Sequence, residues 1–403
     1  MATPPSPELD LNNLRAIKVL GNGAMGTVFL VHDTCSDPLS NFPFALKAVE
    51  KYSPIAKPEA DRRARWEVSV LERVTEKPNP FLPKLIGFFE TEEIIAWAIP
   101  FCPGGDLNVL RHRQMDRVFS PSVIRFYLAE IVCALQHLHE MGIVYRDLKP
   151  ENILIQSTGH VTLTDFDLSR DLAQKSLKSL ILASEPLDVN KHIQHKKLTR
   201  FFTLAREKNN VKLKKAKSAR VTPMSRRNAS FCSNGEHSNS FVGTEEYVAP
   251  EVVRGDGHEF AVDWWALGVL SYEMLYGTTP FRGKNRKDTF GRILMMPPKF
   301  PGKPNVLTDL ITKLLEKEPT RRLGYARGAC EIQEHPFFDG LKWDMLTEVL
   351  RPPFIPSRDD TELTENVGGI NITEYFKKLR QLPTPLDSPS RDECGYDVSF
   401  SEF

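Results

Sequence analysis

The sequence predicts an α+β fold with two lobes: a small, mostly β N-terminal lobe with one helix, and a larger, mostly helical C-terminal lobe. Apolar residues alternate through residues 14–46, which is the period of strands with one buried face. Apolar and charged groups then recur at helical spacing in residues 59–75. The segments 120–141 and 263–276 have the same helical period, so the second half of the chain is predicted to be mainly helical.

The chain of 403 residues, of which 41% are hydrophobic, is long enough for one large two-lobed domain or for two ordinary ones. We predict a disordered N-terminus at 1–13, a first lobe at 14–99, a second lobe at 100–338 and a C-terminal tail at 339–403. An insert at 171–238 interrupts the second lobe. This insert holds fifteen Lys or Arg and five Asp or Glu, a net charge of +10, so the rest of the chain carries −9.

Seven of the fifteen basic residues of the insert form two clusters. They are Lys212, Lys214, Lys215, Lys217 and Arg220, followed by Arg226 and Arg227. Such clusters are typical of signals that bind an import receptor or an anionic membrane lipid. The alternative is a spacer whose charge only keeps it soluble. The insert has phenylalanines but no recognised RNA or DNA module, so we do not expect a nucleic-acid partner.

The compartment is indicated by the cysteines and by the apolar runs. The six cysteines lie far apart with no CxxC pair, which argues for a reducing compartment and against a disulfide framework or a zinc site. No apolar run approaches the roughly 18 to 20 residues that span a bilayer. Ala2 does not provide the glycine that myristoylation needs. We therefore expect the cytoplasm, with the nucleus or the peripheral plasma membrane as alternatives.

A glycine-rich segment at 21–28, Gly-Asn-Gly-Ala-Met-Gly-Thr-Val, could place backbone N–H groups on the phosphates of a nucleotide. A dinucleotide-binding turn would instead lead into a helix and be followed about 20 residues later by an acid. Residues 27–31 favour a strand. We therefore predict a nucleotide-binding turn between two strands, and the alternative is an ordinary glycine hairpin.

The segment 145–152, Tyr-Arg-Asp-Leu-Lys-Pro-Glu-Asn, is followed by Thr-Asp-Phe-Asp at 164–167. One carboxylate can accept a proton from a hydroxyl, and one lysine can neutralise a phosphate. An asparagine and a second aspartate can hold magnesium. This combination indicates transfer of a phosphoryl group from a nucleotide to an alcohol.

Together these segments resemble the eukaryotic protein kinases, and the resemblance covers residues 14–403. It implies a two-lobed protein kinase fold that uses ATP and Mg2+. Tyr145, where most kinases have histidine, points to the AGC group, as do Pro-Pro-Phe-Ile-Pro at 352–356 and the terminal Phe-Ser-Glu-Phe at 400–403. Asp-Phe-Asp at 165–167 with the basic insert resembles the plant-specific subfamily VIII, most closely its UNICORN-type branch, which the family links to planar growth of tissues.

The resemblance implies catalytic roles for four residues. Asp147 would accept the proton of the acceptor hydroxyl, and Lys149 would sit on the transferred phosphoryl group. Lys47 would grip the α- and β-phosphates with Glu67 as its partner. A pseudokinase scaffold is the rival interpretation, but it would be expected to lack Lys47, Asp147 or Asp165, and all three are present.

The resemblance also implies the ligand-binding residues. Asn152 and Asp165 match the magnesium ligands. The implied nucleotide-binding residues are Leu20, Gly21, Gly23, Gly26, Val28, Ala45, Lys47, Pro100, Cys102 and Asp106. Asp106, Glu151 and Glu273 match positions that read arginines before the acceptor Ser or Thr, so protein substrates with basic residues there are expected. The alternative is that Glu273 is structural and Asp106 holds the ribose.

The resemblance implies regulatory sites as well. Ser240 matches the activation-segment phosphosite, which Arg63, Arg146 and Arg170 would surround. Ser230 follows Arg227 by three residues and is a candidate for autophosphorylation. Phe400 and Phe403 match the pair that recruits the phosphoinositide-dependent kinase.

Asp167 departs from the family pattern, because related kinases have glycine at this position. An aspartate removes torsional freedom from the metal-binding segment and adds charge near the magnesium. We expect this change to disfavour the flipped-out, inactive arrangement of the segment and to leave catalysis by Asp165 intact.

Overall fold

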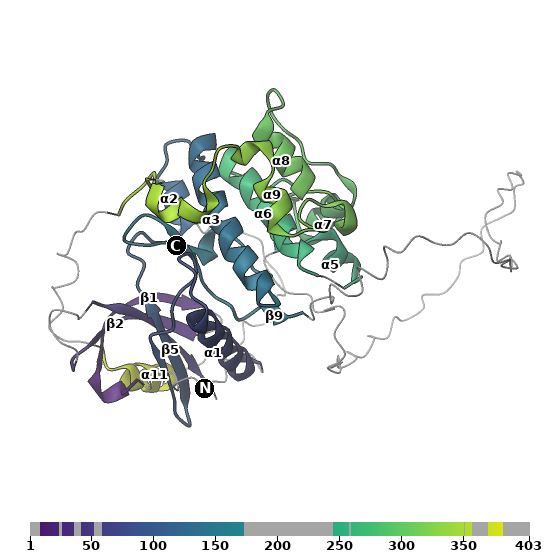
Figure 1. The fold of residues 1–403 in the computed structure, drawn as a ribbon. Coiled ribbons are helices and arrows are strands. Elements are labelled where there is room, and N and C mark those ends of the chain that lie inside the picture. The colour runs from purple at the N-terminus through teal and green to yellow at the C-terminus, as the bar shows by residue number, and fades with distance from the viewer. Residues whose placement is uncertain are drawn as a thin grey trace, which may run out of the picture. The chain divides into compact units, whose positions relative to one another are not determined.

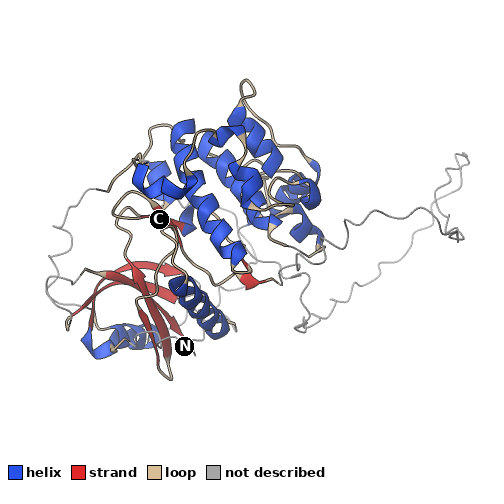
Figure 2. Ribbon diagram, viewed as in Figure 1, coloured by secondary structure: helices blue, strands red, loops and turns tan. Residues whose placement is uncertain are grey.

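The computed structural model describes residues 9–23, 26–35, 42–51, 59–172, 245–257, 259–349, 351–356 and 370–381. The strands gather mainly in the first lobe and the helices mainly in the second (Figure 2). This arrangement confirms the predicted α+β class.

The first lobe is built on an antiparallel sheet with the strand order β1-β2-β3-β5-β4. Its strands are β1 (Leu14–Gly23), β2 (Gly26–Asp33), β3 (Phe44–Glu50), β4 (Gly87–Glu90) and β5 (Ile94–Pro100). Alternate residues of β3 are buried at 44–48, as the period of two in the sequence predicted, whereas β2 buries Phe29, Leu30 and Val31 in succession. The sheet presents the glycine-rich turn at one end and the last residue of β5 at the start of the second lobe.

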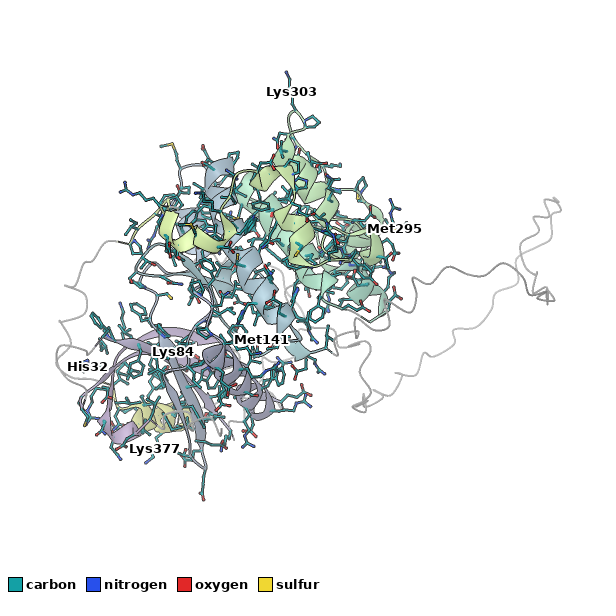
Figure 3. The ribbon with its side chains drawn as sticks, in the orientation of Figure 1. His32, Lys84, Met141, Met295, Lys303 and Lys377 are labelled. Atoms are coloured by element: carbon teal, nitrogen blue, oxygen red, sulfur yellow. The ribbon has the colours of Figure 1, made fainter. Side chains whose placement is uncertain are left out.

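Two helices cover the two faces of this sheet (Figure 1). The predicted helix at 59–75 is α1 (Ala60–Glu76), which buries Ala64, Val68 and Leu71 at helical spacing against the core shared with the second lobe. The helix α11 (Ile372–Gln381) packs on the other face, where Phe376 is only 3% exposed. Lys377, labelled in Figure 3, lies on the exposed side of α11.

The prediction of a disordered N-terminus at 1–13 is wrong for residues 9–13. Leu11–Asn13 form a turn of 3-10 helix, η1, and the side chain of Asp10 accepts a hydrogen bond from the Asn12 amide. The Leu9 amide donates to the Phe88 carbonyl at 3.1 Å. Leu9 and Leu11 pack against the sheet face that α11 covers, so apolar burial orders this segment despite its polar neighbours.

The second lobe contains the longest helices, α3 (Pro121–Glu140) and α6 (Ala261–Tyr276), which correspond to the two predicted helices. Ser120 caps α3 by accepting a hydrogen bond from the Val123 amide, and Pro121 occupies the first turn. Nearly every side chain of α6 is buried because this helix is apolar on all sides and lies at the centre of the lobe.

Shorter elements complete the second lobe. The helices are α2 (Leu107–His112), α5 (Pro250–Arg254), α7 (Arg286–Met295), α8 (Val306–Leu314), α9 (Ala329–Gln333) and α10 (Leu346–Val349). The strands form two antiparallel pairs, β6 (Ile143–Val144) with β9 (Arg170–Asp171), and β7 (Ile153–Ile155) with β8 (Val161–Leu163). Turns of 3-10 helix are η2 (Pro150–Asn152), η3 (Glu245–Tyr247), η4 (Pro319–Arg321), η5 (Pro336–Phe338) and η6 (Trp343–Met345).

The short strand pairs carry the chemistry-bearing segments. Residues 145–152 lie between β6 and β7, and Asp165 to Asp167 lie between β8 and β9. Both segments are therefore loops that begin and end in hydrogen-bonded strands, which is how a rigid scaffold positions reactive side chains. Within the ranges that the structure describes, we find no helix of the length and apolarity that a membrane span requires.

Candidate active site

The glycine-rich turn connects two strands. β1 and β2 pair antiparallel up to Gly23 opposite Gly26, so the segment leads into a strand and not into the helix that a dinucleotide-binding turn requires. A side chain built on Gly21 would meet no atom within 4 Å, and one on Gly23 would approach only the Gly26 carbonyl at 3.9 Å. Gly26 has φ +129°, and a Cβ there would lie 2.4 Å from the Ala48 carbonyl oxygen. Gly21 and Gly23 thus leave space open beside the backbone, and position 26 requires glycine.

A cleft of about 1140 Å³ lies beneath this turn and between the two lobes. It is lined by these predicted site residues: Leu20, Gly21, Gly23, Gly26, Val28, Ala45, Lys47, Glu67, Pro100, Cys102, Asp106, Asp147, Lys149, Glu151, Asn152 and Asp165. The size and the mixture of apolar walls with a few polar groups suit a nucleotide. The structure therefore brings together in one cavity residues that the sequence spreads from 20 to 165.

Lys47 stands at the centre of the ionic arrangement in the cleft. Its Nζ lies 2.7 Å from Glu67 Oε2 and 2.6 Å from Asp165 Oδ1. Burial by itself would lower the pKa of Lys47, but the charges of Glu67 and Asp165 raise it above its usual value. Burial also raises the pKa of Glu67 to about 7, against the lowering effect of Lys47. Lys47 is thus held as a cation that joins α1 to the metal-binding segment.

Asp147 is held by two neighbours from its own loop. Lys149 Nζ lies 2.9 Å from Asp147 Oδ2, and the Asn152 amide donates to the same oxygen at 2.8 Å and to the Asp147 carbonyl at 2.9 Å. These bonds use the Asn152 nitrogen, which leaves its amide oxygen as the group that could ligate a metal. The carboxylate, the lysine and the asparagine therefore form one compact polar group at the floor of the cleft.

Asp263 of α6 holds the catalytic loop from below. Its carboxylate accepts hydrogen bonds from the Tyr145 amide at 2.9 Å and the Arg146 amide at 2.7 Å, and it lies 2.8 Å from His139 Nε2. Arg146 and Asp165 have φ values of 70° and 60°, a left-handed conformation that costs free energy at non-glycine residues. The sequence placed Asp263 only at the start of the predicted helix at 263–276. The contact with residues 145 and 146 could not be predicted because Asp263 is far from them along the chain.

The two acids of the metal-binding segment differ in electrostatic environment. Burial would raise the pKa of Asp165, but Lys47, Lys149 and Arg63 hold it below its usual value. Burial and the charge of Asp165 raise the pKa of Asp167. Asp167 lies 3.4 Å from Arg63 of α1, a contact that the sequence did not predict.

The donor set fits magnesium with ATP. Among the described residues, no group of three or more His, Cys, Asp or Glu side chains could hold a metal by itself. Magnesium commonly takes one or two protein carboxylates and completes its shell with water and substrate phosphates. Asp165 and the oxygen of Asn152 provide such a partial set in the cavity that the glycines at 21, 23 and 26 also line.

The predicted substrate-reading acids do not share one environment. Asp106 caps α2 by accepting from the Val109 amide at 2.7 Å, and Glu151 is exposed at the cleft. Glu273 lies outside the cleft lining, where it pairs with Arg111 at 3.2 Å and accepts a hydrogen bond from Tyr247 at 2.5 Å.

The three acids nevertheless interact. Although part of the Glu151 side chain is exposed, its carboxyl is partly desolvated by the walls of the cleft, which raises its pKa, and the negative charges of Glu273 and Asp106 add to this effect. Arg111 and Tyr247 were missed by sequence reasoning, because neither belongs to a motif with a chemical signature.

The arginines predicted to surround the activation-segment phosphosite lie near one another. The pKa of Arg146 is lowered to about 10 by burial and by the charges of Arg170 and Arg63. Ser240 lies outside the described residues, as do the other predicted regulatory positions Ser230, Phe400 and Phe403.

The beginning of the tail and its helix contact different lobes. Phe354 packs against the core of the second lobe, and its ring centroid lies 6.3 Å from that of Phe119. Ile372 and Tyr375 pack on the outer face of the first-lobe sheet and do not line the cleft. The apolar side of α11 is buried there against Phe29, so this helix covers the sheet and does not contact the nucleotide cleft.

Comparison with known proteins agrees with this geometry. The protein kinase domain family matches residues 14–200 and 228–338. The serine/threonine-protein kinase UCNL of Arabidopsis thaliana is 59% identical over 412 residues, which cover 100% of this chain and 99% of the relative. UCN of the same plant is 57% identical over 408 residues, covering 99% and 97%. OXI1 is 47% identical over 383 residues, covering 93% and 88%. The chain therefore belongs to the protein kinase family, as a serine/threonine-protein kinase of the plant AGC group that is similar to the UCN-type kinases.

Proposed function

We propose that this kinase transfers the γ-phosphoryl group of ATP, with Mg2+, to Ser or Thr hydroxyls that follow basic residues in protein substrates. The observation that carries the proposal is the position of Lys47, within 2.7 Å of Glu67 and 2.6 Å of Asp165, in the same cleft as Asp147. When bound, ATP would supply the phosphoryl group and Mg2+ would neutralise its developing charge.

The residues divide the work according to their charges. Lys47, aligned by Glu67, holds the phosphates, and Asp165 and Asn152 hold the metal. Asp147 accepts the proton of the acceptor hydroxyl, and Lys149, 2.9 Å from it, places a positive charge beside the group in transfer. The bonds from Asn152 keep the Asp147 carboxylate oriented before substrate arrives.

A peptide-array phosphorylation assay tests this assignment. Asp165→Asn and Asp147→Asn should each lose at least about a hundredfold in rate. The first removes a charged ligand of the metal, and the second removes a positioned base, which contributes about 10²- to 10⁴-fold. Asp147→Asn should still bind a fluorescent ATP analogue, because Asp147 acts on the acceptor. The control is Asp256→Asn, an exposed aspartate paired with Arg254 outside the cleft, which should keep full rate. Full activity of either active-site variant would contradict the assignment.

The wild type and the Asp165→Asn variant also serve to test autophosphorylation. Arg227 precedes Ser230 by three residues, which fits the basic preference proposed above. Mass spectrometry after incubation with ATP and magnesium should find phosphate on Ser230 in the wild type and none in Asp165→Asn. Active enzyme without phosphate on Ser230 would rule this out.

The terminal phenylalanines support a proposal for a partner. Phe400 and Phe403 are spaced as two aromatic anchors and match the pair that recruits the phosphoinositide-dependent kinase in related AGC kinases. Phe400→Ala/Phe403→Ala should lose that kinase in a pull-down. Undiminished capture by the double variant would contradict the docking role.

A role in plant growth signalling, and an address for the basic insert, complete the proposal. The similarity to UCN-type relatives supports the first, and the charge of +10 on residues 171–238 supports the second. Growth defects in a plant that lacks this kinase should be reversed by the wild type and not by Asp165→Asn. Neutralising both basic clusters should shift the protein from the nucleus or the plasma membrane toward the cytoplasm, and an unchanged distribution would leave the insert without an address.

A further inference from the structure

Asp167 replaces a glycine of the family pattern without strain. Among the described non-glycine residues, a positive φ occurs only at Arg117, Arg146 and Asp165, so the backbone of Asp167 is in a region open to any side chain. Its side chain is only 5% exposed, and its Oδ2 lies 3.4 Å from Arg63 Nη1. Burying a carboxylate costs free energy unless the carboxylate is paired with a positive charge, and Arg63 provides that charge.

The Asp167 contact is the first of three between α1 and residues 167–171. Trp66 Nε1 donates to Ser169 Oγ at 3.0 Å, and Arg73 Nη1 donates to Asp171 Oδ1 at 2.6 Å. We call these three contacts the α1 ladder. Positions 63, 66 and 73 lie on one side of the helix, and positions 167, 169 and 171 alternate along an extended segment. The three helix positions on one side of α1 therefore face the three alternate positions of the extended segment.

The steps of the ladder differ in exposure. Arg73 and Asp171 are 32% and 56% exposed, so their ion pair is screened by water and contributes little. Asp167 and Arg63 are 5% and 25% exposed. Of the two ion pairs in the ladder, the one between Asp167 and Arg63 therefore contributes more to holding α1 in position.

The ladder lies beside the pair that prepares the cleft. Glu67 follows Trp66 directly and bonds to Lys47, while Asp165 precedes Asp167 by two residues and bonds to the same lysine. Any rotation of α1 that separates Arg63 from Asp167 would also carry Glu67 away from Lys47. The two contacts are mechanically coupled because a helix turns as one body.

We propose that Asp167 is a positioning residue that acts through Arg63 to fasten α1, so that Glu67 remains on Lys47. The inference rests on the proposed function only in taking the Lys47–Glu67 pair to be needed for catalysis. That Asp167 and Arg63 hold α1 in position is a property of the nucleotide-free protein. The competing role for Asp167 is that of an added magnesium ligand, since Asp165 lies close enough for its charge to raise the pKa of Asp167.

A double-mutant cycle on the full chain tests the proposal. The variants are Asp167→Asn, Arg63→Gln and the two combined, with Arg63→Lys as the conservative replacement. Each single variant should lower kcat about tenfold, and the double variant should lose no more than either single one, because partners in contact are not additive. Arg63→Lys, which keeps the positive charge, should retain most of the wild-type kcat. If Asp167→Asn lowers kcat by the same factor in the wild-type background as in the Arg63→Gln background, the proposal is overturned.

A second readout needs no nucleotide. The indole N–H of Trp66 gives its own NMR signal, assigned among the five tryptophans by Trp66→Phe. In nucleotide-free protein, Asp167→Asn and Arg63→Gln should shift this signal in the same way and speed its hydrogen exchange. This arm holds even if the catalytic assignments above fail. An unchanged Trp66 signal together with a raised magnesium requirement would assign Asp167 to the metal and overturn the positioning role.

The matched control removes the same charge one residue away. Arg62 is exposed on α1 and lies off the ladder, 2.9 Å from Glu59. Arg62→Gln should leave both the rate and the Trp66 signal as in the wild type. Equal effects of Arg62→Gln and Arg63→Gln would mean that general charge on α1 matters and not the contact with Asp167.

Discussion

Glu251 and Arg322 form a two-bond ion pair that solvent barely reaches. Arg322 Nη1 and Nη2 donate to Glu251 Oε1 at 2.6 Å and Oε2 at 2.9 Å, and their side chains are 0% and 3% exposed. Arg322 also donates to the Ala261 carbonyl at the start of α6. This pair ties α5 to the turn before α9 and lies outside the cleft.

The first prediction concerns this pair. Glu251→Gln should lower the free energy of unfolding by about 3–5 kcal/mol, because it leaves the Arg322 charge buried without compensation. Thermal denaturation at one scan rate measures the loss. Glu334→Gln removes a carboxylate from an ion pair with Arg327 whose side chains are 60% and 58% exposed, so it should change stability by less than about 0.5 kcal/mol. Equal losses in both variants would contradict the role of burial.

A second prediction separates recognition from structure among the acids. Glu151 is exposed, so Glu151→Gln should lower kcat/KM for peptides with arginines before the acceptor and leave the melting temperature unchanged. Glu273 is bound by Arg111 and Tyr247, so Glu273→Gln should lower both quantities. Measurements of kcat/KM on arginine-rich and arginine-free peptides, with the melting temperature of each variant, test this separation. Equal rates of the wild type on the two peptides would refute a basic preference.

The tail helix provides a third prediction. Phe376 is 3% exposed on the outer face of the sheet, with its ring centroid 6.1 Å from that of Phe29. Phe376→Ala should destabilise the first lobe by about 3 kcal/mol, the lower end for a buried phenylalanine. Lys377→Ala, on the exposed side of α11 in Figure 3, is the control and should have little effect. A melting temperature that stays the same in Phe376→Ala would mean that α11 does not dock in solution.

The fourth prediction concerns pH and Lys317. Its Nζ lies 3.7 Å from the centre of the Phe281 ring and donates to the Ile293 carbonyl at 2.5 Å. Burial, followed by the charge of Arg322, lowers the pKa of Lys317 to about 8. The unfolded chain keeps this proton up to a pH near 10.4, so the cost of holding it in the folded protein disappears as pH rises from about 8 toward 10.

Lys317→Met provides the comparison for this fourth prediction. The melting temperature of the wild type relative to Lys317→Met should rise between pH 7.5 and pH 10. Lys342→Met, at a lysine for which burial is slight, should show no such trend. A constant difference between wild type and Lys317→Met across this range would mean that Lys317 titrates normally.

Much of the fold could be predicted because the relevant signals are local. The helices α1, α3 and α6 begin and end within a few residues of the predicted bounds, since each has a helical period and α3 has a capping serine. The residues 9–13 were mispredicted because their order comes from the packing of Leu9 and Leu11 on a sheet whose strands extend to Pro100, and from the hydrogen bond of Leu9 to Phe88. Composition alone cannot report such a contact.

The cleft residues could be found from the sequence because each occupies a motif whose residue types have a specific chemistry. Lys47, Asp147, Asn152 and Asp165 are bound to one another or line the same cavity, as the motifs implied. The contacts that hold these motifs in place have no such signature. Asp263 reaches the catalytic loop across 117 residues, and Arg63 reaches Asp167 across 104.

The amino-acid sequence by itself determined which groups are available for phosphoryl transfer and in which local elements they lie, because residue type and spacing set both. Only the tertiary structure decided which partner each charge has. Arg63 faces Asp167, Glu273 faces Arg111, and α11 covers the outer face of the sheet. These pairings depend on how helices and strands distant in sequence pack together, and packing responds to the shape of the whole core, which no local pattern encodes.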